Sequence, residues 1–241
     1  MSSEEQEGDT ETILPIDEHE EVVSEGGKKV RRRGIYLLPN LFTTAALFSG
    51  FYAVLAAVNG KFESAALAIF VAMILDGLDG RVARMTNTQT AFGAEYDSLS
   101  DMVAFGLAPA LVMYVWALKG LGKFGWLAAF IYTAAAALRL ARFNTQVGIA
   151  DKRYFQGLPS PAAAAIMAAC VWGAVEYGVE RTDVAWVVGI LTAAVGLLMV
   201  SNFRYHSFKE LDVRGKVPFF VLVIIMLAFA IILWEPPFIL F

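Results

Sequence analysis

Four aspartates stand in otherwise apolar sequence, and their spacing groups them in two pairs. Asp76 and Asp79 are three residues apart, and Asp97 and Asp101 are four residues apart. On a helix, either spacing places both side chains of the pair on one face. Ionised carboxylates inside a bilayer are costly and persist where another group offsets their charge. The two pairs therefore predict a cation site between two helices.

The candidate ligand atoms indicate the type of cation. Neither His nor Cys lies near the four aspartates, so the candidate ligands are all oxygen atoms. Oxygen ligands favour Mg²⁺, Mn²⁺ or Ca²⁺ over zinc. Two neighbouring cations could stabilise the attacking and the leaving oxygen of a displacement reaction together. The alternative is a set of aspartates that only join helices by hydrogen bonds, but four acids without matching bases would be strongly destabilising.

Small and basic residues accompany the aspartates. Gly80 and Gly93 lack a Cβ atom, so a ligand could approach their backbone closely. Ala83 is small enough to serve the same purpose one turn after Gly80. Arg84 carries a guanidinium fork that matches phosphate oxygens. Glycines also serve close packing between helices, so these residues alone leave both interpretations open.

The whole pattern, D-x2-D-G-x2-A-R-x8-G-x3-D-x3-D, resembles the signature of the CDP-alcohol phosphatidyltransferases. Every signature position is filled in this chain, which makes the resemblance specific. Four further stretches are similar to the bacterial and archaeal CDP-diacylglycerol–serine O-phosphatidyltransferases. These stretches are 38–44, 92–101, 139–144 and 154–161.

The resemblance implies an enzyme that transfers the phosphatidyl group of CDP-diacylglycerol to the hydroxyl of L-serine, giving phosphatidylserine and CMP. It implies two Mg²⁺ or Mn²⁺ ions and a catalytic role for Asp101 as general base. The metal ligands that it implies are Asp76, Asp79, Asp97 and Asp101. The CDP contacts that it implies are Asp76, Gly80, Ala83, Arg84 and Gly93.

Three alternative functions stay open at this point. A related phosphatidyltransferase would use glycerol 3-phosphate, inositol phosphate or another alcohol as acceptor. An intramembrane prenyltransferase also carries Asp-rich helices and Mg²⁺, although the D-G-x2-A-R portion of the pattern argues against it. A cation transporter would use the aspartates for binding without any chemical transfer.

A second polar group follows at the end of a later apolar run. Arg139 and Arg142 are three residues apart and could bind a lipid phosphate or the carboxylate of serine. The alternative is that their long side chains reach lipid headgroups at the membrane surface. The resemblance extends this acceptor pocket to Asn144, Lys152, Arg153 and Ser160.

The elements that carry these residues are predicted to be membrane helices. The chain is 58% hydrophobic with a mean hydropathy of +0.58, which is too apolar for an ordinary soluble domain. The expected fold is an all-α integral membrane protein, a six-helix bundle of the CDP-alcohol phosphotransferase type plus one C-terminal transmembrane helix. The expected spans are roughly 40–59, 62–86, 95–118, 123–146, 159–178, 184–202 and 217–234.

Charge divides the chain into regions. The net charge is −4, yet residues 1–27 hold ten of the 23 acidic residues and no Lys or Arg. We therefore expect an acidic disordered cytoplasmic tail at 1–27 and a basic juxtamembrane segment at 28–39. The six-helix catalytic membrane domain follows at 40–202, and a cytoplasmic loop with the additional helix at 203–241. The basic body suits anionic lipid and pyrophosphate substrates, and no nucleic-acid partner is expected.

Basic residues also predict the topology. With the amino terminus in the cytoplasm, only four of the 19 Lys and Arg residues fall at the opposite side. These four are Lys61, Lys119, Lys123 and Arg181. The asymmetry follows the positive-inside rule, and the five tryptophans all fall toward the non-cytoplasmic ends. We expect a multi-pass, homodimeric protein of the cytoplasmic membrane with its amino terminus and active site on the cytoplasmic side.

Overall fold

The computed structural model of the chain describes residues 22–25, 28–31, 37–85, 90–146, 154–202 and 204–206. Apart from two short strand pairs, these residues form an all-α membrane bundle, and six of the predicted spans are confirmed as helical within a few residues. The helices are α1 (Leu37–Val58), α2 (Phe62–Met85), α3 (Ala91–Asp101), α4 (Ala108–Trp116), α5 (Lys123–Gln146), α6 (Ser160–Glu176) and α7 (Arg181–Val200). The π-helical turn η1 (Met102–Leu107) joins α3 to α4, and the 3₁₀ turn η2 (Leu118–Leu121) follows α4. The predicted span at 217–234 lies outside the described residues.

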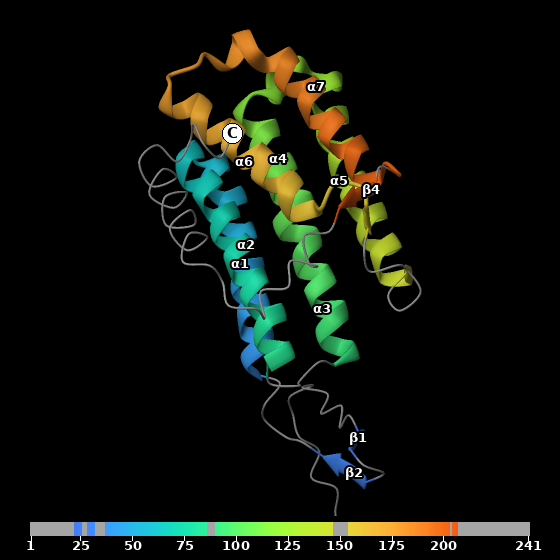
Figure 1. The fold of residues 1–241 in the computed structure, drawn as a ribbon. Helices are drawn as coiled ribbons and strands as arrows, with labels where there is room; N and C mark the ends of the chain where they lie inside the picture. Colours follow the sequence, from blue (N-terminus) through green and yellow to red (C-terminus); the bar gives the residue numbers. More distant parts are fainter. Residues whose placement is uncertain are drawn as a thin grey trace, which may run out of the picture.

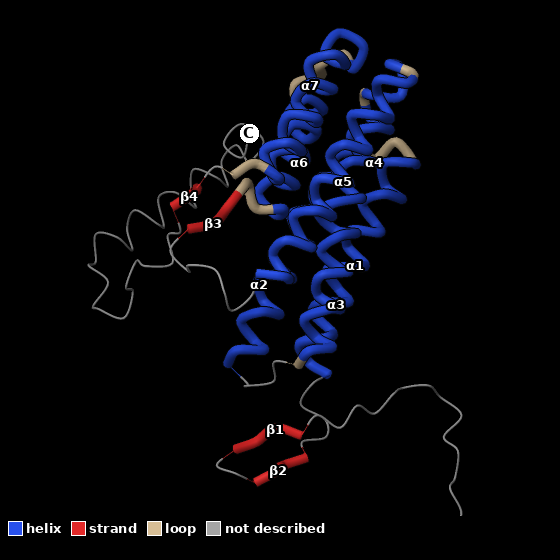
Figure 2. Tube along the Cα trace, turned by 90° about the vertical axis from the view of Figure 1, so that its right-hand side faces the viewer, coloured by secondary structure: helices blue, strands red, loops and turns tan. Residues whose placement is uncertain are grey.

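The helices pack as an elongated bundle. Figures 1 and 2 show α1 beside α2, α6 against α2, and α7 against α5, while α3 and α4 run on as one rod beside α1. Four helical stretches are long and apolar enough to cross a membrane, namely Pro39–Val58, Phe92–Trp116, Lys123–Thr145 and Arg181–Val200. Helix α2 carries Glu63 in its first turn and four charged residues, Asp76, Asp79, Arg81 and Arg84, in its second half, and α6 is shorter. The outer faces expose large apolar side chains such as Phe48 and Val187, as helices in contact with lipid do.

Close packing in this bundle depends on small residues. A Cβ atom on Gly50 of α1 would lie 2.7 Å from the Cα of Ala104, and one on Gly196 of α7 would lie 2.8 Å from the Cα of Tyr132. Small side chains at such crossings let membrane helices approach each other closely. The first crossing brings α1 against η1, the turn that begins directly after Asp101.

A proline follows closely after the π-helical turn. Pro109 has no N–H group, so the carbonyl of Phe105 four residues earlier lacks its usual helical donor. The Tyr132 hydroxyl of α5 donates to that carbonyl at 3.0 Å. The Thr133 hydroxyl lies 3.0 Å from the carbonyl of Ala129 in its own helix and 3.4 Å from the carbonyl of Gly106. Side-chain donors from a neighbouring helix are one way in which a membrane protein satisfies freed backbone groups. The hydrophobic pattern of the sequence does not predict this turn.

Two short antiparallel strand pairs accompany the helices, and they were not predicted either. Strand β1 (Val22–Glu25) pairs with β2 (Lys28–Arg31), with Val22 opposite Arg31. Strand β3 (Tyr154–Gln156) pairs with β4 (Arg204–His206) and so joins the segment before α6 to the segment after α7. The first pair crosses the boundary expected between tail and basic segment, and the division of the chain into regions stays a prediction.

Candidate active site

Three of the four aspartates form one cluster. Asp76 comes from α2, and Asp97 and Asp101 come from α3. One carboxylate oxygen from each of the three lies within 4.8 Å of the others, and all three side chains are half-buried. The helical spacing of the two pairs therefore brings carboxylates from two helices to one place.

The fourth aspartate is held differently. Asp79 is only 5% exposed, and its Oδ2 accepts a hydrogen bond of 2.7 Å from the hydroxyl of Thr43 on α1. It lies outside the group of three mutually close oxygens. Asp79 and Asp97 nevertheless line the same cavity, so Asp97 belongs to both the cluster and the cavity.

The cluster fits divalent cations with oxygen ligands. Three carboxylates this close repel one another when ionised, and a cation between them removes that cost. The Oδ1 atom of Asp97 is buried and has no hydrogen-bond partner among the described residues. A buried carboxylate oxygen left without a donor is unfavourable in the protein alone, which is the state expected of a metal ligand.

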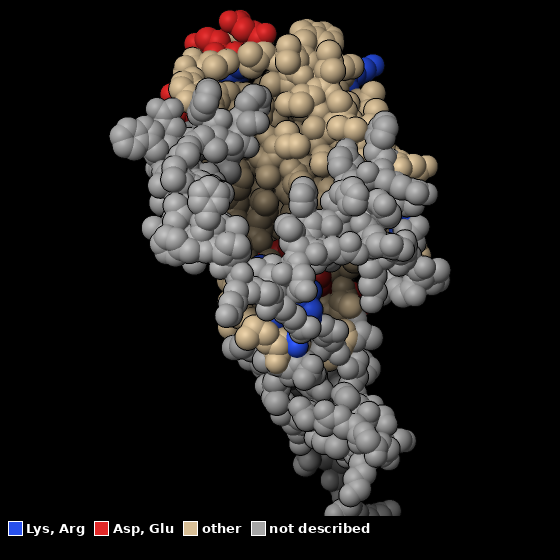
Figure 3. All heavy atoms as spheres, viewed as in Figure 1, with Lys and Arg blue, Asp and Glu red and all other residues tan. Residues whose placement is uncertain are grey.

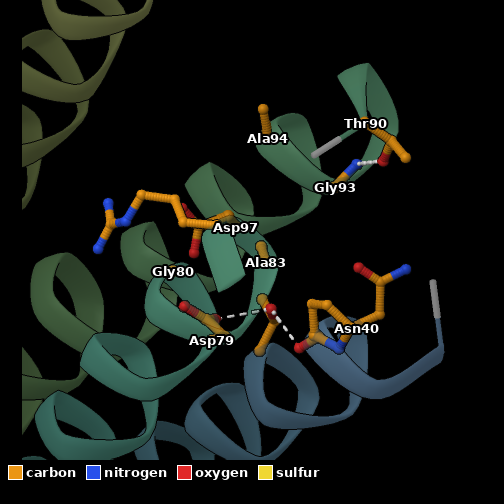
Figure 4. Close-up of a pocket in the computed structure, with 11 residues that line it drawn as sticks. Asn40, Asp79, Gly80, Ala83, Thr90, Gly93, Ala94 and Asp97 are labelled. Atoms are coloured by element: carbon orange, nitrogen blue, oxygen red, sulfur yellow. Dashed lines mark hydrogen bonds between the residues drawn. The ribbon is translucent and has the colours of Figure 1, made fainter. Parts of the chain in front are cut away.

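A cavity of about 220 Å³ opens beside the cluster, where three helices meet. Its lining comes from the start of α1, the end of α2 and the start of α3, with Thr90 directly before α3. In Figure 4, Asp79 and Asp97 lie at one side of the cavity, and Asn40 and Thr90 lie at the other. The lining residues are Pro39, Asn40, Thr43, Asp79, Gly80, Ala83, Arg84, Thr90, Gly93, Ala94 and Asp97.

The residues predicted for CDP divide between the cavity and the cluster. Gly80, Ala83, Arg84 and Gly93 all line the cavity, whereas Asp76 lies in the cluster. A Cβ atom on Gly80 would meet only the end of the Arg84 side chain, at 4.0 Å. Gly80 therefore has no packing neighbour that requires a glycine, which favours the interpretation that its open backbone serves a ligand.

Glycine at position 93 is explained by its local contacts. A Cβ atom there would lie 3.0 Å from Oγ1 of Thr90, and that same oxygen accepts a hydrogen bond of 2.8 Å from the Gly93 N–H. Thr90 is thus the N-cap of α3, and glycine three residues later lets the cap close tightly. The cap fixes the start of the helix that carries Asp97 and Asp101.

Sequence reasoning assigned no role to three polar residues of this cavity. Asn40 and Thr43 stand in the 38–44 stretch that resembles the family, and this resemblance was the one signal available for them. Thr90 lies just before α3, where a Ser or Thr cap is a common start signal. Their proximity to the aspartates follows from tertiary packing, which spacing along the chain does not reveal.

The described residues of the predicted acceptor pocket lie at more than one place in the bundle. Arg139 donates to the hydroxyl of the buried Ser160 at 3.1 Å and interacts electrostatically with Asp101. Its Nε atom is buried with no hydrogen-bond partner in the described part of the chain. Arg139 and Ser160 therefore form one unit beside the Asp cluster.

The other described residues of this predicted pocket lie elsewhere. Arg142 donates to the carbonyl of Val200, the last residue of α7, at 3.1 Å and to Asn202 at 3.4 Å. The guanidinium of Arg142 thus donates to a carbonyl at the carboxyl end of a helix, where carbonyls have no donor from within the helix. Asn144 exchanges hydrogen bonds with Ser98 on α3 at 3.0 and 3.3 Å. Lys152 and Arg153 lie outside the described residues.

The surface separates two charged regions. In Figure 3, acidic and basic atoms meet in a recess in the lower half of the bundle, and a second acidic patch lies at the top, over the α6–α7 turn. The exposed acids of that second patch are Glu176, Glu180 and Asp183. The recessed acids and the exposed patch are thus at different levels of the bundle.

Comparison with known proteins identifies the family. Residues 36–198 match the CDP-alcohol phosphatidyltransferase family model. The chain belongs to the CDP-alcohol phosphatidyltransferase family. The matched region contains the Asp cluster, the cavity and the Arg139–Ser160 unit. Membership decides against the prenyltransferase and transporter alternatives, because this is a family of phosphatidyltransferases.

Relatives of this CDP-alcohol phosphatidyltransferase cover most of the chain. The CDP-diacylglycerol–serine O-phosphatidyltransferase of Helicobacter pylori (strain 26695) is 39% identical over 199 residues, which is 80% of this chain and 81% of the relative. The protein of the same name from Mycobacterium tuberculosis (strain H37Rv) is 35% identical over 195 residues, covering 78% and 68%. The one from Bacillus subtilis (strain 168) is 31% identical over 173 residues, covering 72% and 92%.

Proposed function

We propose that this protein transfers the phosphatidyl group of CDP-diacylglycerol to the hydroxyl of L-serine, forming phosphatidylserine and releasing CMP. The observation that carries this proposal is the position of the three-carboxylate cluster beside a cavity lined by Gly80, Ala83, Arg84 and Gly93. The names of the relatives support serine as the acceptor. The membrane bundle provides the lipid environment that the donor substrate requires.

The Asp cluster is the proposed holder of divalent cations. Asp76, Asp97 and Asp101, together with Asp79, would hold Mg²⁺ or Mn²⁺, and two ions suit four carboxylates best. When bound, such ions neutralise charge on the pyrophosphate and on the attacking oxygen. Because Asp97 lines both cluster and cavity, a nucleotide in the cavity would have its pyrophosphate next to these carboxylates.

The described residues can perform the transfer in one displacement. Asp101 accepts the proton of the serine hydroxyl, and the serine oxygen attacks the phosphatidyl phosphorus. The bond between that phosphorus and the bridging pyrophosphate oxygen breaks, and CMP leaves with the electron pair. Arg84, at the cavity wall, pairs with phosphate oxygens. Catalysis then comes mainly from positioning and charge neutralisation.

Arg139 is the proposed contact for the serine carboxylate. It lies close enough to Asp101 for electrostatic interaction, and its buried Nε has no described partner. A carboxylate held by Arg139 would place the serine hydroxyl near the carboxylate of Asp101. Ser160 orients the guanidinium by accepting from its NH1 group.

Replacing Arg139 by Ala should raise the KM for serine by about ten- to a hundredfold, with a smaller change in the KM for CDP-diacylglycerol. Loss of a charge-assisted hydrogen bond of about 1.5–3 kcal/mol gives this range. Arg142→Ala is the matched control, since Arg142 bonds to the end of α7. It should lower thermal stability and leave the KM for serine within a few-fold.

Steady-state kinetics with each substrate varied in turn separates the outcomes for Arg139. A larger change in the dependence on CDP-diacylglycerol would reassign Arg139 to the lipid phosphate. Unchanged kinetics for both substrates would remove it from the acceptor site.

An acceptor panel tests the proposed function itself. Purified protein in detergent is given CDP-diacylglycerol, Mn²⁺ or Mg²⁺, and one alcohol at a time, and the lipid product is separated by chromatography. Serine should give phosphatidylserine, whereas glycerol 3-phosphate, inositol phosphate and free inositol should give no new lipid. A lipid product from glycerol 3-phosphate or inositol phosphate instead of serine would assign the protein to a sister activity.

We also propose a cytoplasmic active site and a homodimer. The distribution of Lys and Arg supports the orientation by the positive-inside rule. Cys170 is buried, so single cysteines introduced at exposed Lys61 and exposed Arg84 can report the two sides by labelling of intact cells. Lys61 should be labelled from outside and Arg84 only after the membrane is opened. Cross-linking in membranes measures the oligomeric state.

A further inference from the structure

We infer that Thr43 of α1 is a positioning residue that fixes the geometry of the cation site through Asp79. Its hydroxyl donates to Oδ2 of Asp79 at 2.7 Å, and Figure 4 marks this bond with a dashed line at Asp79. The same hydroxyl lies 3.2 Å from the carbonyl of Pro39. The shorter contact, to an acceptor that is charged when ionised, is the stronger of the two.

Thr43 also reaches the second helix of the site. Its backbone carbonyl accepts a hydrogen bond of 3.1 Å from the hydroxyl of Ser100, the residue directly before Asp101. One residue of α1 is therefore bonded to α2 at Asp79 and to α3 at Ser100. The two helices that carry the carboxylates, α2 and α3, are thus both hydrogen-bonded to Thr43 of α1.

Because these residues are buried, losing one of these hydrogen bonds is energetically costly. Thr43, Asp79 and Ser100 are 4%, 5% and 2% exposed, so water does not replace a missing partner freely. Asp79 has two carboxylate oxygens, and the bond to Thr43 occupies Oδ2. The hydroxyl therefore restricts the rotation of the Asp79 carboxylate. Partners that orient metal-ligating carboxylates change metal affinity or activity by about ten- to a hundredfold when removed.

Removing the Thr43 hydroxyl should therefore weaken cation binding by about tenfold. Thr43→Val keeps the shape of the side chain and loses the donor, whereas Thr43→Ser keeps the donor. Thr192→Val is the control for a buried threonine, because Thr192 is 0% exposed and its hydroxyl donates within α7, to the carbonyl of Val188. Thr43→Ser and Thr192→Val should bind the cation within about threefold of wild type.

The measurement is Mn²⁺ binding to the purified protein without CDP-diacylglycerol or serine, read from the electron paramagnetic resonance signal of free Mn²⁺. The inference rests on the proposed function in that the same cations serve the transfer, but this readout requires no turnover. If Thr43→Val binds Mn²⁺ about tenfold more weakly than wild type, the inference stands even when the protein transfers no serine.

A double substitution tests the route of the effect. Adding Thr43→Val to Asp79→Asn should change Mn²⁺ affinity little further, because the partner of the hydroxyl is already altered. Equal losses with and without Asp79→Asn would overturn the inference, as would wild-type Mn²⁺ affinity in Thr43→Val or an equal loss in Thr43→Ser. If Thr43→Val fails to fold, Thr43→Ala removes the hydroxyl with less bulk and is measured in its place.

Discussion

Asp97→Asn should lower turnover by on the order of a thousandfold while the protein still inserts and folds. The substitution keeps the size of the side chain and removes the charge that a cation requires. Asp97 is the residue that the cluster and the cavity share, and its Oδ1 is buried without a partner among the described residues. The loss should appear in kcat with CDP-diacylglycerol and serine both saturating.

The matched control for this prediction is Asp183→Asn. Asp183 is exposed in the first turn of α7, in the acidic patch away from the cluster, and should tolerate the same change with full activity. Mn²⁺ binding measured on both variants shows whether the lost activity follows the lost cation. Wild-type turnover in Asp97→Asn, with unchanged dependence on metal, would contradict the cation site.

Gly80→Leu should reduce kcat/KM for CDP-diacylglycerol by more than about a hundredfold. A Cβ atom at this position enters open space at the cavity wall, with only the end of Arg84 within 4.0 Å. Leucine also favours helix more than glycine, so α2 should not lose stability. The expected loss therefore reports a blocked ligand and not a disturbed fold.

Gly77→Leu is the control on the same helix. Gly77 is exposed, and a Cβ atom there has no neighbour within 4 Å, but Gly77 is not among the residues that line the cavity. Thermal unfolding should be similar for the two variants, and Gly77→Leu should keep activity within a few-fold. Full activity of Gly80→Leu would mean that the cavity is not the nucleotide site.

The helical period made the Asp cluster predictable. Spacings of three and four residues place each pair on one face, and the apolar flanks predict two membrane helices that carry them. The structure indeed brings Asp76 of α2 to Asp97 and Asp101 of α3. The same period predicted one shared face for Arg139 and Arg142, but not that one contacts Ser160 and the other the end of α7.

Features that depend on tertiary packing could not be predicted. Thr43 is 36 residues from Asp79, and nothing in their local sequence links the two. The π-helical turn lies just before Pro109 and accepts a hydrogen bond from Tyr132 of α5, and only the proline is visible in the sequence as a helix irregularity. The pairing of β3 with β4 joins segments on either side of two helices, and both strands are only three residues long.

The central claim is that serine accepts the phosphatidyl group of CDP-diacylglycerol at the Asp cluster. The most direct measurement follows isotopically labelled serine and CMP in one reaction of the purified protein with CDP-diacylglycerol and Mn²⁺. Our account predicts one lipid-bound serine for each CMP released, and formation of both products about a thousandfold more slowly by Asp97→Asn. Release of CMP without lipid-bound serine, or formation of both products by Asp97→Asn at the wild-type rate, would contradict it.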